Sequence, residues 1–264
     1  MQLPIKRKLD KYLGWLLIGI FLPPTRLLGI LLRRNHGIQE PPRQILFIKL
    51  LGLGSLVLAS DSIKAMRRQW PDTRFILLTD SNIADGIAPF HLFDEIWSCR
   101  SGRLSATLAD ALRFLRQSWK RRKLWVADLE VYSKLTTAFA LLTFARNRFG
   151  FSLSPVFFRK YLNTHNVPFD RLGPLEDNYV YMARAVTGTT LPVYPALKTR
   201  RDEYRKPYIV LNNTCSELAP HRKLPEQTFS QICQWILDNT SYRVALLGAV
   251  TDREAMNNMI ERHS

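Results

Sequence analysis

The chain has 264 residues, which is enough for one large domain or two of ordinary size. Hydrophobic residues make up 46% of it, which excludes an intrinsically disordered chain. The net charge of +16 indicates a negatively charged partner, namely nucleic acid, an anionic bilayer or a phosphorylated substrate. The three cysteines form no CxxC pair and the five histidines lack metal-ligand spacing, so we expect neither a disulfide framework nor a metal site, in a reducing cytoplasmic compartment.

Residues 1–36 form a hydrophobic segment with basic residues at both ends. Pro23, Pro24 and Arg26 interrupt its apolar run. We expect the proline pair to break the helix, and a charge in mid-segment is unfavourable in lipid, so a spanning helix is disfavoured. The pattern favours an anchor that lies in the membrane plane or re-enters it, at the cytoplasmic face of the inner membrane. The alternative is a hydrophobic helical arm packed on the protein itself or on a partner.

The stretch Gln44–Trp70 predicts a Rossmann-like α/β unit. It contains a buried strand at Ile45–Leu50, a turn with Gly52 and Gly54, and a helix that we expect to open at Ser55 as its N-cap. Two glycines let the backbone turn sharply and leave N–H groups free. These groups and the helix dipole favour a negatively charged ligand, most often a phosphate.

Strands and helices alternate from there to about residue 190. We expect strands at 74–79, 94–97, 123–129 and 148–151, and helices at 83–90, 104–120, 134–146 and from 175 or 176 to 186, the last ending near Gly188. This alternation predicts a domain over 44–190 with a parallel sheet covered on both faces. Asp128 and Glu130 follow a strand at its carboxyl end, where ligands of such sheets bind. The alternatives for these carboxylates are solvation or pairing with an arginine such as Arg148.

A second, smaller α/β unit is predicted over 207–264, after a charged, proline-containing connection at 191–206. Its expected strands are 208–211 and 243–247, and its expected helices are 225–239 and a last one from 251 or 252. Open sheets usually carry about four to six strands. We therefore expect this second domain to be incomplete, or to be completed by a partner.

Four stretches, in this order, resemble glycosyltransferase family 9, which includes the ADP-heptose:lipopolysaccharide heptosyltransferases. They are the strand, glycine turn and helix with the following strand at 45–79, WVADLEVYSKLTTAFALLTFARNRFGF at 125–151, NTHNVPFDRLGPLEDNYVYMARAVTG at 163–188, and YIVLNNTCSELAPHRKLPEQTFSQICQWI with YRVALLGAVTDRE at 208–254. The resemblance implies an α/β fold of two Rossmann-like domains (GT-B-like). The acceptor would lie mainly on the first domain and the nucleotide-sugar mainly on the second.

The resemblance also implies a reaction and its residues. A sugar is transferred, with inversion and without a metal or cofactor, from an ADP-heptose-type donor to the lipopolysaccharide core or another envelope glycan. Diphosphate contacts are implied for Arg222, Lys223 and two hydroxyls, a nucleoside contact for Asp252, and an acceptor-phosphate contact for His165. The full set of implied substrate-binding residues is Gly52, Gly54, Glu130, His165, Thr214, Ser216, Arg222, Lys223 and Asp252.

Two departures from the family pattern count against activity. The family carries an aspartate, its presumed catalytic base, at the position of Ser55, and a serine hydroxyl cannot accept a proton at neutral pH as a carboxylate does. The family's later acidic-glycine-histidine motif would lie beyond Ser264. We therefore expect a poor enzyme or an inactive one.

Two other classes of function stay open. Gly52-x-Gly54 after a strand, with Asp80 ending the next, partly matches the fingerprint of a dinucleotide-binding oxidoreductase, although Val57 stands where a third glycine or alanine belongs. The other class is a non-catalytic, membrane-associated binding module. Recognisable RNA- or DNA-binding motifs are absent, so we do not expect nucleic acid as a partner. The expected partners are a nucleotide-sugar donor, a glycolipid acceptor and the inner-membrane surface.

Overall fold

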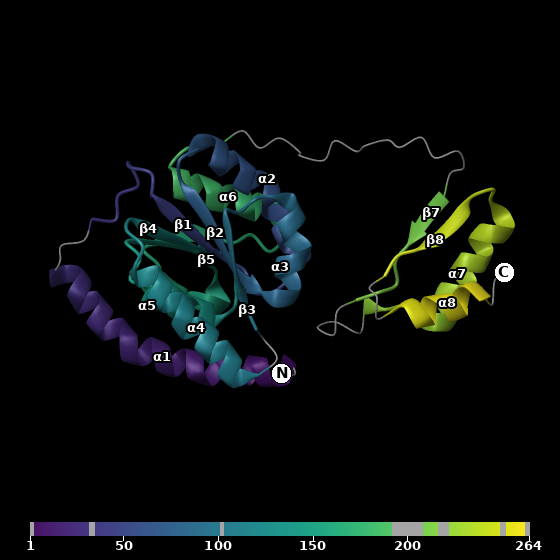
Figure 1. The fold of residues 1–264 in the computed structure, drawn as a ribbon, viewed down its shortest axis with the longest axis horizontal. Coiled ribbons are helices and arrows are strands. Elements are labelled where there is room, and N and C mark those ends of the chain that lie inside the picture. Colours follow the sequence, from purple (N-terminus) through teal and green to yellow (C-terminus); the bar gives the residue numbers. More distant parts are fainter. Residues whose placement is uncertain are drawn as a thin grey trace. The chain divides into compact units, whose positions relative to one another are not determined.

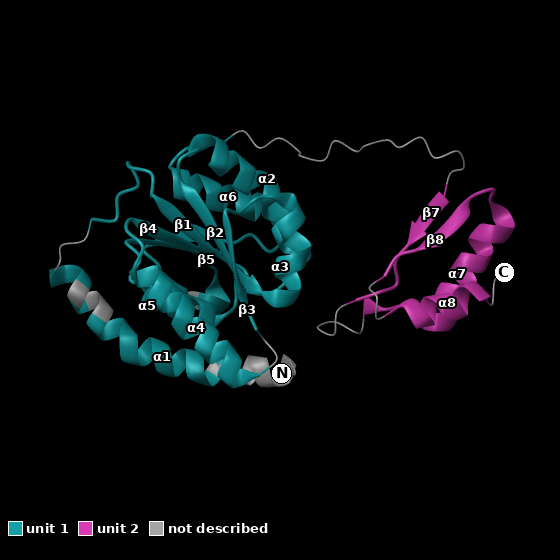
Figure 2. Ribbon diagram, viewed as in Figure 1, with its two compact units in different colours: residues 1–197 teal, residues 198–264 magenta. Residues whose placement is uncertain are grey.

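The computed structural model describes residues 3–31, 35–100, 103–191, 208–215, 222–248 and 252–261. The chain divides into two compact units, Met1–Leu197 and Lys198–Ser264 (Figure 2). The connection expected at 191–206 lies almost wholly outside the described residues.

The first unit is built on a parallel sheet of six strands in the order β3-β2-β1-β4-β5-β6 (Figure 1). Its strands are β1 (Gln44–Ile48), β2 (Arg74–Asp80), β3 (Glu95–Cys99), β4 (Leu124–Asp128), β5 (Asn147–Ser152) and β6 (His165–Pro168). The central strands β1 and β4 are buried on both faces, which is why they are nearly continuous apolar runs. The strand order reverses between β1 and β4, so their carboxyl ends form the switch point at which such sheets bind ligands.

Helices cover both faces of this sheet. On one face pack α2 (Leu53–Gln69), α3 (Ser81–Ile87) and α6 (Leu175–Thr187), and on the other α4 (Leu104–Trp119) and α5 (Lys134–Leu142). The 3₁₀ helices η1 (Ala88–Phe90) and η2 (Ser154–Tyr161) complete the unit. The predicted α/β alternation is therefore confirmed.

A further helix, α1 (Leu3–Leu31), packs on the outer side of α5 and η2. The prediction that the proline pair breaks this helix is wrong, because α1 runs through Pro23 and Pro24. The two prolines withhold the hydrogen bonds that the carbonyls of Gly19 and Ile20 would accept. Both of these residues are exposed, so water can satisfy their carbonyl groups. Packing of the preceding turns, through Ile18 and Phe21, on α5 and η2 offsets part of the remaining cost.

Two differences from the predicted elements have local causes. The helix expected at 134–146 ends at Leu142, because Phe144 takes a left-handed conformation with φ 55° that turns the chain toward β5. The segment with η2 and β6 was not predicted. Its strand HNVP is short, half polar and contains a proline, so it lacks the apolar alternation that indicates a strand.

The second unit contains a parallel pair of strands, β7 (Tyr208–Leu211) and β8 (Arg243–Leu246). Two helices, α7 (Glu226–Asn239) and α8 (Arg253–Glu261), accompany them. A small core holds these elements together, with Phe229, Cys233 and Met259 as its buried members. These strands and helices agree with the predicted ones.

Asp110 fixes α4 to the end of β3. Its carboxylate accepts hydrogen bonds from the backbone N–H, Nε and Nη2 of Arg100 at 2.9–3.0 Å, and Arg113 lies 3.3 Å away. The side-chain hydrogen bond from Arg100 is the main cause that lowers the pKa of Asp110. A lowered folded-state pKa adds stability above the ordinary aspartate pKa of about 4, and this stability is lost as the pH falls through the lowered value.

We expect Asp110→Asn to lower the free energy of unfolding by about 1–2 kcal/mol at pH 7, because charge-assisted hydrogen bonds are lost from a partly exposed pair. The difference from the wild type should shrink as the pH falls through the lowered pKa of Asp110, because the wild-type carboxyl is then itself protonated. Thermal melts between pH 2.5 and 7 measure this. Asp72→Asn, in an exposed turn, is the control and should change little. An equal deficit of Asp110→Asn at every pH would contradict the electrostatic explanation.

Candidate site at the carboxyl ends of the strands

The turn after β1 is made by Gly52. It takes φ 85°, a conformation that favours glycine, and it is the N-cap of α2. The prediction that the helix opens at Ser55 with Ser55 as its cap is wrong, because α2 begins at Leu53 and Ser55 is its third residue. Gly54 lies inside the first helical turn, with nothing within 4 Å of an added Cβ. The chain turns at Gly52 alone, and this allows the helix to start two residues early.

Glu130 binds the backbone of this turn. Its Oε1 accepts hydrogen bonds from the amides of Leu50 and Leu51 at 2.8 and 2.9 Å, and its Oε2 lies 3.4 Å from Lys49 Nζ. Glu130 is buried, and so is Lys49. An internal carboxylate therefore occupies amides that the sequence suggested for an anionic ligand. Substrate contacts for Glu130, Gly52 and Gly54 stay predictions.

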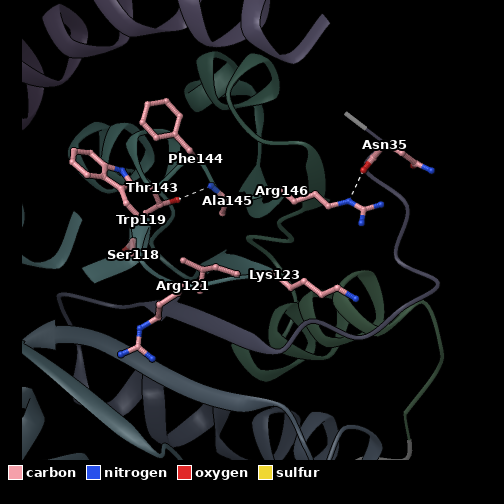
Figure 3. A pocket seen from close by; sticks show the side chains of 10 residues that line it. Asn35, Ser118, Trp119, Arg121, Lys123, Thr143, Phe144, Ala145 and Arg146 are labelled. Atoms are coloured by element: carbon pink, nitrogen blue, oxygen red, sulfur yellow. Dashed lines mark hydrogen bonds between the residues drawn. The ribbon is translucent and has the colours of Figure 1, made fainter. Parts of the chain in front are cut away.

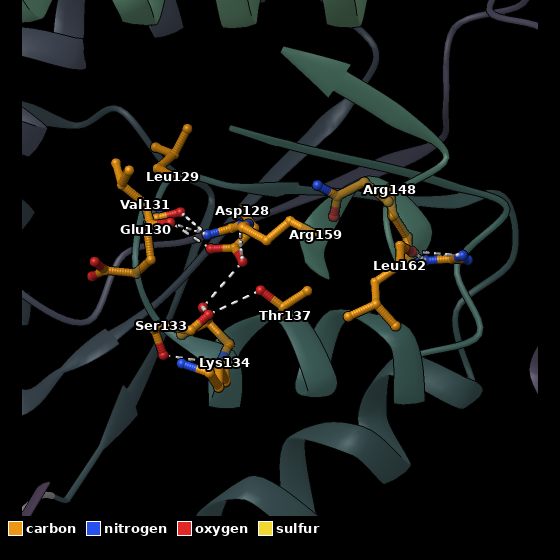
Figure 4. A network of polar contacts seen from close by, with 12 residues as sticks. Asp128, Leu129, Glu130, Val131, Ser133, Lys134, Thr137, Arg148, Arg159 and Leu162 are labelled. Atoms are coloured by element: carbon orange, nitrogen blue, oxygen red, sulfur yellow. Dashed lines mark hydrogen bonds and ion pairs between the residues drawn. The ribbon is translucent and has the colours of Figure 1, made fainter. Parts of the chain in front are cut away.

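A buried ion pair supports the loop that carries Glu130 (Figure 4). Nη2 of Arg159, in η2, lies 2.6 Å from Oδ2 of Asp128, and both side chains are fully buried. Nη1 of Arg159 donates to the carbonyls of Glu130 and Val131. The arginine that pairs with Asp128 is thus Arg159, whereas the guanidinium of Arg148, the partner considered from the sequence, donates to the carbonyls of Leu162 and Ala145. Burial raises the pKa of Asp128 to about 6, so the carboxylate is still ionised at pH 7.

Ser55 has a hydroxyl partner that the sequence did not reveal. It is hydrogen-bonded to Tyr179 of α6. Burial is the largest cause that raises the pKa of the Tyr179 phenol to about 12, and Glu130 adds to it. Neither hydroxyl can take up a proton at neutral pH, so this pair by itself supplies no general base.

His165 lies apart from the turn. It begins β6, three strands from β1, which corresponds to about 14 Å across the sheet. Its ring stacks on Phe149 at 4.3 Å, and its Nδ1 lies 2.9 Å from the Thr164 hydroxyl oxygen. Burial, with a further contribution from His36, lowers the pKa of His165. Its contact with an acceptor phosphate stays a prediction, and at neutral pH it would be made by an uncharged ring.

In the second unit, three predicted residues follow β7 and β8 at their carboxyl ends. Thr214 donates from its amide and its hydroxyl to Oδ1 of Asn212, both at 2.8 Å. Lys223 Nζ lies 3.5 Å from Oδ1 of Asp252. A Cβ added at Gly248 would lie 3.0 Å from Cγ2 of Thr214, so the two loops approach closely. The structure thus brings the predicted phosphate and nucleoside contacts to one edge of this unit.

Two remaining predicted contacts are less defined. Arg222 is exposed beside Lys223. Ser216 lies outside the described residues. Among the residues that the structure does describe, no group of three or more His, Cys, Asp and Glu side chains is arranged to hold a metal ion.

A pocket of about 700 Å³ opens elsewhere, before the amino ends of β4 and β5 (Figure 3). Trp119 and Phe144 line it together with three cationic side chains. Each cation already has a partner: Arg121 pairs with Glu95, Lys123 with Glu40, and Arg146 with the carbonyl of Asn35. None of the predicted site residues lines this pocket, so it is not the candidate site.

Both units therefore place polar and charged side chains at the carboxyl ends of parallel strands. This arrangement is that of nucleotide-binding α/β folds. A six-stranded parallel unit followed by a second, smaller one defines a GT-B-like architecture, as predicted.

Three solved structures that are similar to this chain are a family 9 glycosyltransferase and two heptosyltransferases. A glycosyltransferase of family 9 from Veillonella parvula DSM 2008 has a TM-score of 0.64 at 15% identity, over 86% of this chain and 68% of its own. The ADP-heptose lps heptosyltransferase II of E. coli has a TM-score of 0.60 at 14% identity, over 83% and 68%. The E. coli heptosyltransferase WaaC with ADP has a TM-score of 0.64 at 12% identity, over 83% and 72%.

The chain therefore has the fold of family 9 glycosyltransferases and ADP-heptose heptosyltransferases, and the predicted resemblance is confirmed at that level. No sequence-family profile and no curated protein sequence matches the chain.

Proposed function

We propose that this protein is a glycosyltransferase that takes its sugar from a nucleotide diphosphate of the ADP-heptose type. The observation that carries the proposal is the fold shared with WaaC, which was solved with ADP and with ADP-2-deoxy-2-fluoro heptose. The grouping of Thr214, Lys223 and Asp252 at one edge of the second unit supports it.

The second unit has the chemistry that a diphosphate leaving group needs. Cationic donors stabilise the charge that develops as the glycosidic bond breaks. Lys223 and Arg222 supply two such cations. The Lys223–Asp252 pair is long and partly exposed, so it is weak, and a diphosphate can draw the ammonium group away from it.

The first unit would hold the acceptor, which we propose to be the lipopolysaccharide core or another envelope glycolipid. In an inverting transfer without a metal, the acceptor hydroxyl attacks the anomeric carbon as ADP leaves, and a base takes up its proton. Ser55 stands where that base is expected, and its only identified partner is a phenol of raised pKa. We therefore propose that transfer is slow.

Titration of the purified protein with ADP and with NADH tests the donor assignment. We expect ADP to bind, and Lys223→Ala to weaken its binding about tenfold, because a charge-assisted contact to phosphate is lost. Arg243→Ala, at the amino end of β8, is the matched control and should leave affinity unchanged. If the protein bound NADH but did not bind ADP, the result would favour the oxidoreductase instead. No binding of ADP, or equal effects of both substitutions, would reject the proposal.

A further inference from the structure

α1 has two apolar faces, of which one packs on the protein. On the packed face Ile18 is buried, and Leu17, Phe21 and Leu22 are partly buried against α5 and η2. On the other face five large side chains are 54–74% exposed, namely Leu16, Ile20, Leu27, Ile30 and Leu31. A surface helix of a globular protein normally carries polar residues opposite its packed stripe. The second apolar face of α1 is therefore unusual for a helix in water.

The packed face is fixed to α5 by two specific contacts. The carboxylate of Asp10 accepts hydrogen bonds from the Ser133 hydroxyl and from the amides of Lys134 and Leu135, at 2.7–3.1 Å. It therefore caps the start of α5. At Gly14 an added Cβ would lie 2.4 Å from Cβ of Lys134, so a glycine is required for this approach. These contacts determine which face of α1 points outward.

The chain that follows α1 returns to the same unit at Asn35 and His36. Nε of Arg146 donates to the carbonyl of Asn35 at 2.6 Å, and Nδ1 of His36 lies 2.6 Å from the carbonyl oxygen of Arg146. By length and composition alone, Tyr12–Leu31 is apolar enough to cross a membrane, with a mean hydropathy of 1.6. However, a helix that packs on one folded unit through its Leu17–Leu22 stretch, and whose following chain returns to that unit at Asn35, cannot span a bilayer without drawing the unit into the hydrocarbon.

We propose that α1 lies in the plane of an anionic bilayer, with the Leu16–Ile20–Leu27 face in the acyl–headgroup boundary, and that it anchors the first unit. An in-plane helix buries its apolar face to this depth and leaves the opposite face to its surroundings, which here are α5 and η2. The helix α4, on the same face of the sheet as α5, adds exposed Leu108 and Leu112 to this side of the unit.

The positive charge of the chain favours a lipid surface as the partner that covers the exposed face of α1. It disfavours a second copy of the chain in that role. The chain carries a net charge of +16, and basic residues flank the apolar run in the sequence, including Lys8, Lys11, Arg33 and Arg34. Two such copies repel each other, whereas an anionic leaflet attracts both the flanks and the whole molecule.

Flotation with vesicles of phosphatidylcholine and phosphatidylglycerol (3:1) tests this proposal, with pure phosphatidylcholine vesicles for comparison. We expect the wild type to float with the anionic vesicles. The Leu16→Glu/Ile20→Glu variant should lower the bound fraction at least tenfold, because two charges enter the apolar boundary. Leu58→Glu, on α2 at the other face of the sheet and also exposed, is the matched control and should bind as the wild type does.

All three proteins should show the same melting temperature, because the substituted side chains are exposed, and this separates lost binding from lost folding. A tag at the N-terminus should be cleaved by protease added outside the vesicles, whereas protection of the tag would overturn the in-plane arrangement in favour of a spanning helix. The proposal would also be overturned if the wild-type protein did not float with anionic vesicles, or if the Leu16→Glu/Ile20→Glu variant floated with them as the wild type does. A dimer that the variant converts to a monomer, with flotation unchanged, would assign the face to a second copy.

Discussion

Arg159→Met is expected to lower the free energy of unfolding by about 3–5 kcal/mol, because it leaves a buried carboxylate without its cation. Asp128 would keep its hydrogen bonds from Thr136 and from the amide of Glu130. It would lose the contact at 2.6 Å that compensates its charge, and two backbone carbonyls would lose their donor. Urea denaturation followed by circular dichroism measures the loss.

The double variant Arg159→Met/Asp128→Leu separates the charge from the packing. Replacing both partners of a buried pair by apolar residues is often close to neutral, so the double variant should be more stable than Arg159→Met alone. Arg148→Met is the matched control, since the Arg148 guanidinium donates to the backbone carbonyls of Ala145 and Leu162, and it should cost only about 1 kcal/mol. If Arg148→Met and Arg159→Met lowered the free energy of unfolding equally, the explanation by an uncompensated buried charge would be wrong.

Ser55→Asp is expected to raise the rate of sugar transfer about 10²–10⁴-fold, because it supplies a general base where the chain has a hydroxyl. A carboxylate is well placed there. Position 55 is in the first turn of α2, which carries no acidic residue, and the helix dipole favours a negative charge at that end. The measurement is ADP release from ADP-heptose in the presence of a lipid A-core acceptor.

Ser55→Asn is the control for this substitution. Asparagine has the shape of aspartate and the capacity to accept a hydrogen bond from Tyr179, but it takes up no proton at neutral pH. It should therefore leave the rate at the wild-type level. If Ser55→Asp brought no gain, or if Ser55→Asn raised the rate as much, the assignment of position 55 to the base would be wrong.

Elements with a strong local pattern could be predicted from the sequence. The apolar run before Gly52 predicted β1, and the helical period ending before Gly188 predicted α6, whose C-cap is that glycine at φ 72°. In both cases a buried stripe and a turn residue lie within a few positions of each other, so neighbouring residues carry the information.

The start of α2 and the path of α1 could not be predicted in the same way. Ser55 is a favourable cap by residue type, yet the helix begins where the backbone of Gly52 turns. A proline pair disfavours a helix, yet α1 continues through Pro23 and Pro24, and its preceding turns pack on α5 and η2. In each case a contact or conformation outside the local window outweighs the residue preference.

Some features of the candidate site could likewise be predicted from the sequence, and others could not. Thr214, Lys223 and Asp252 were singled out by the resemblance to the family, and the structure brings them to one edge of the second unit. The partner of Asp128 could not be identified. Arg159 is 31 positions away and lies in a segment without a clear pattern, so its pairing depends on how η2 packs against the end of β4.

By itself, the sequence of this protein determined two α/β units, the turn after β1 and an N-terminal segment with an excess of apolar residues, because hydrophobic period and turn residues act over short distances. Only the tertiary structure decided which carboxylate binds the turn, which arginine is buried, and which face of α1 stays uncovered. Those outcomes depend on hydrogen bonds and close contacts between residues far apart in the chain, and such contacts form only once the sheet and its helices have packed.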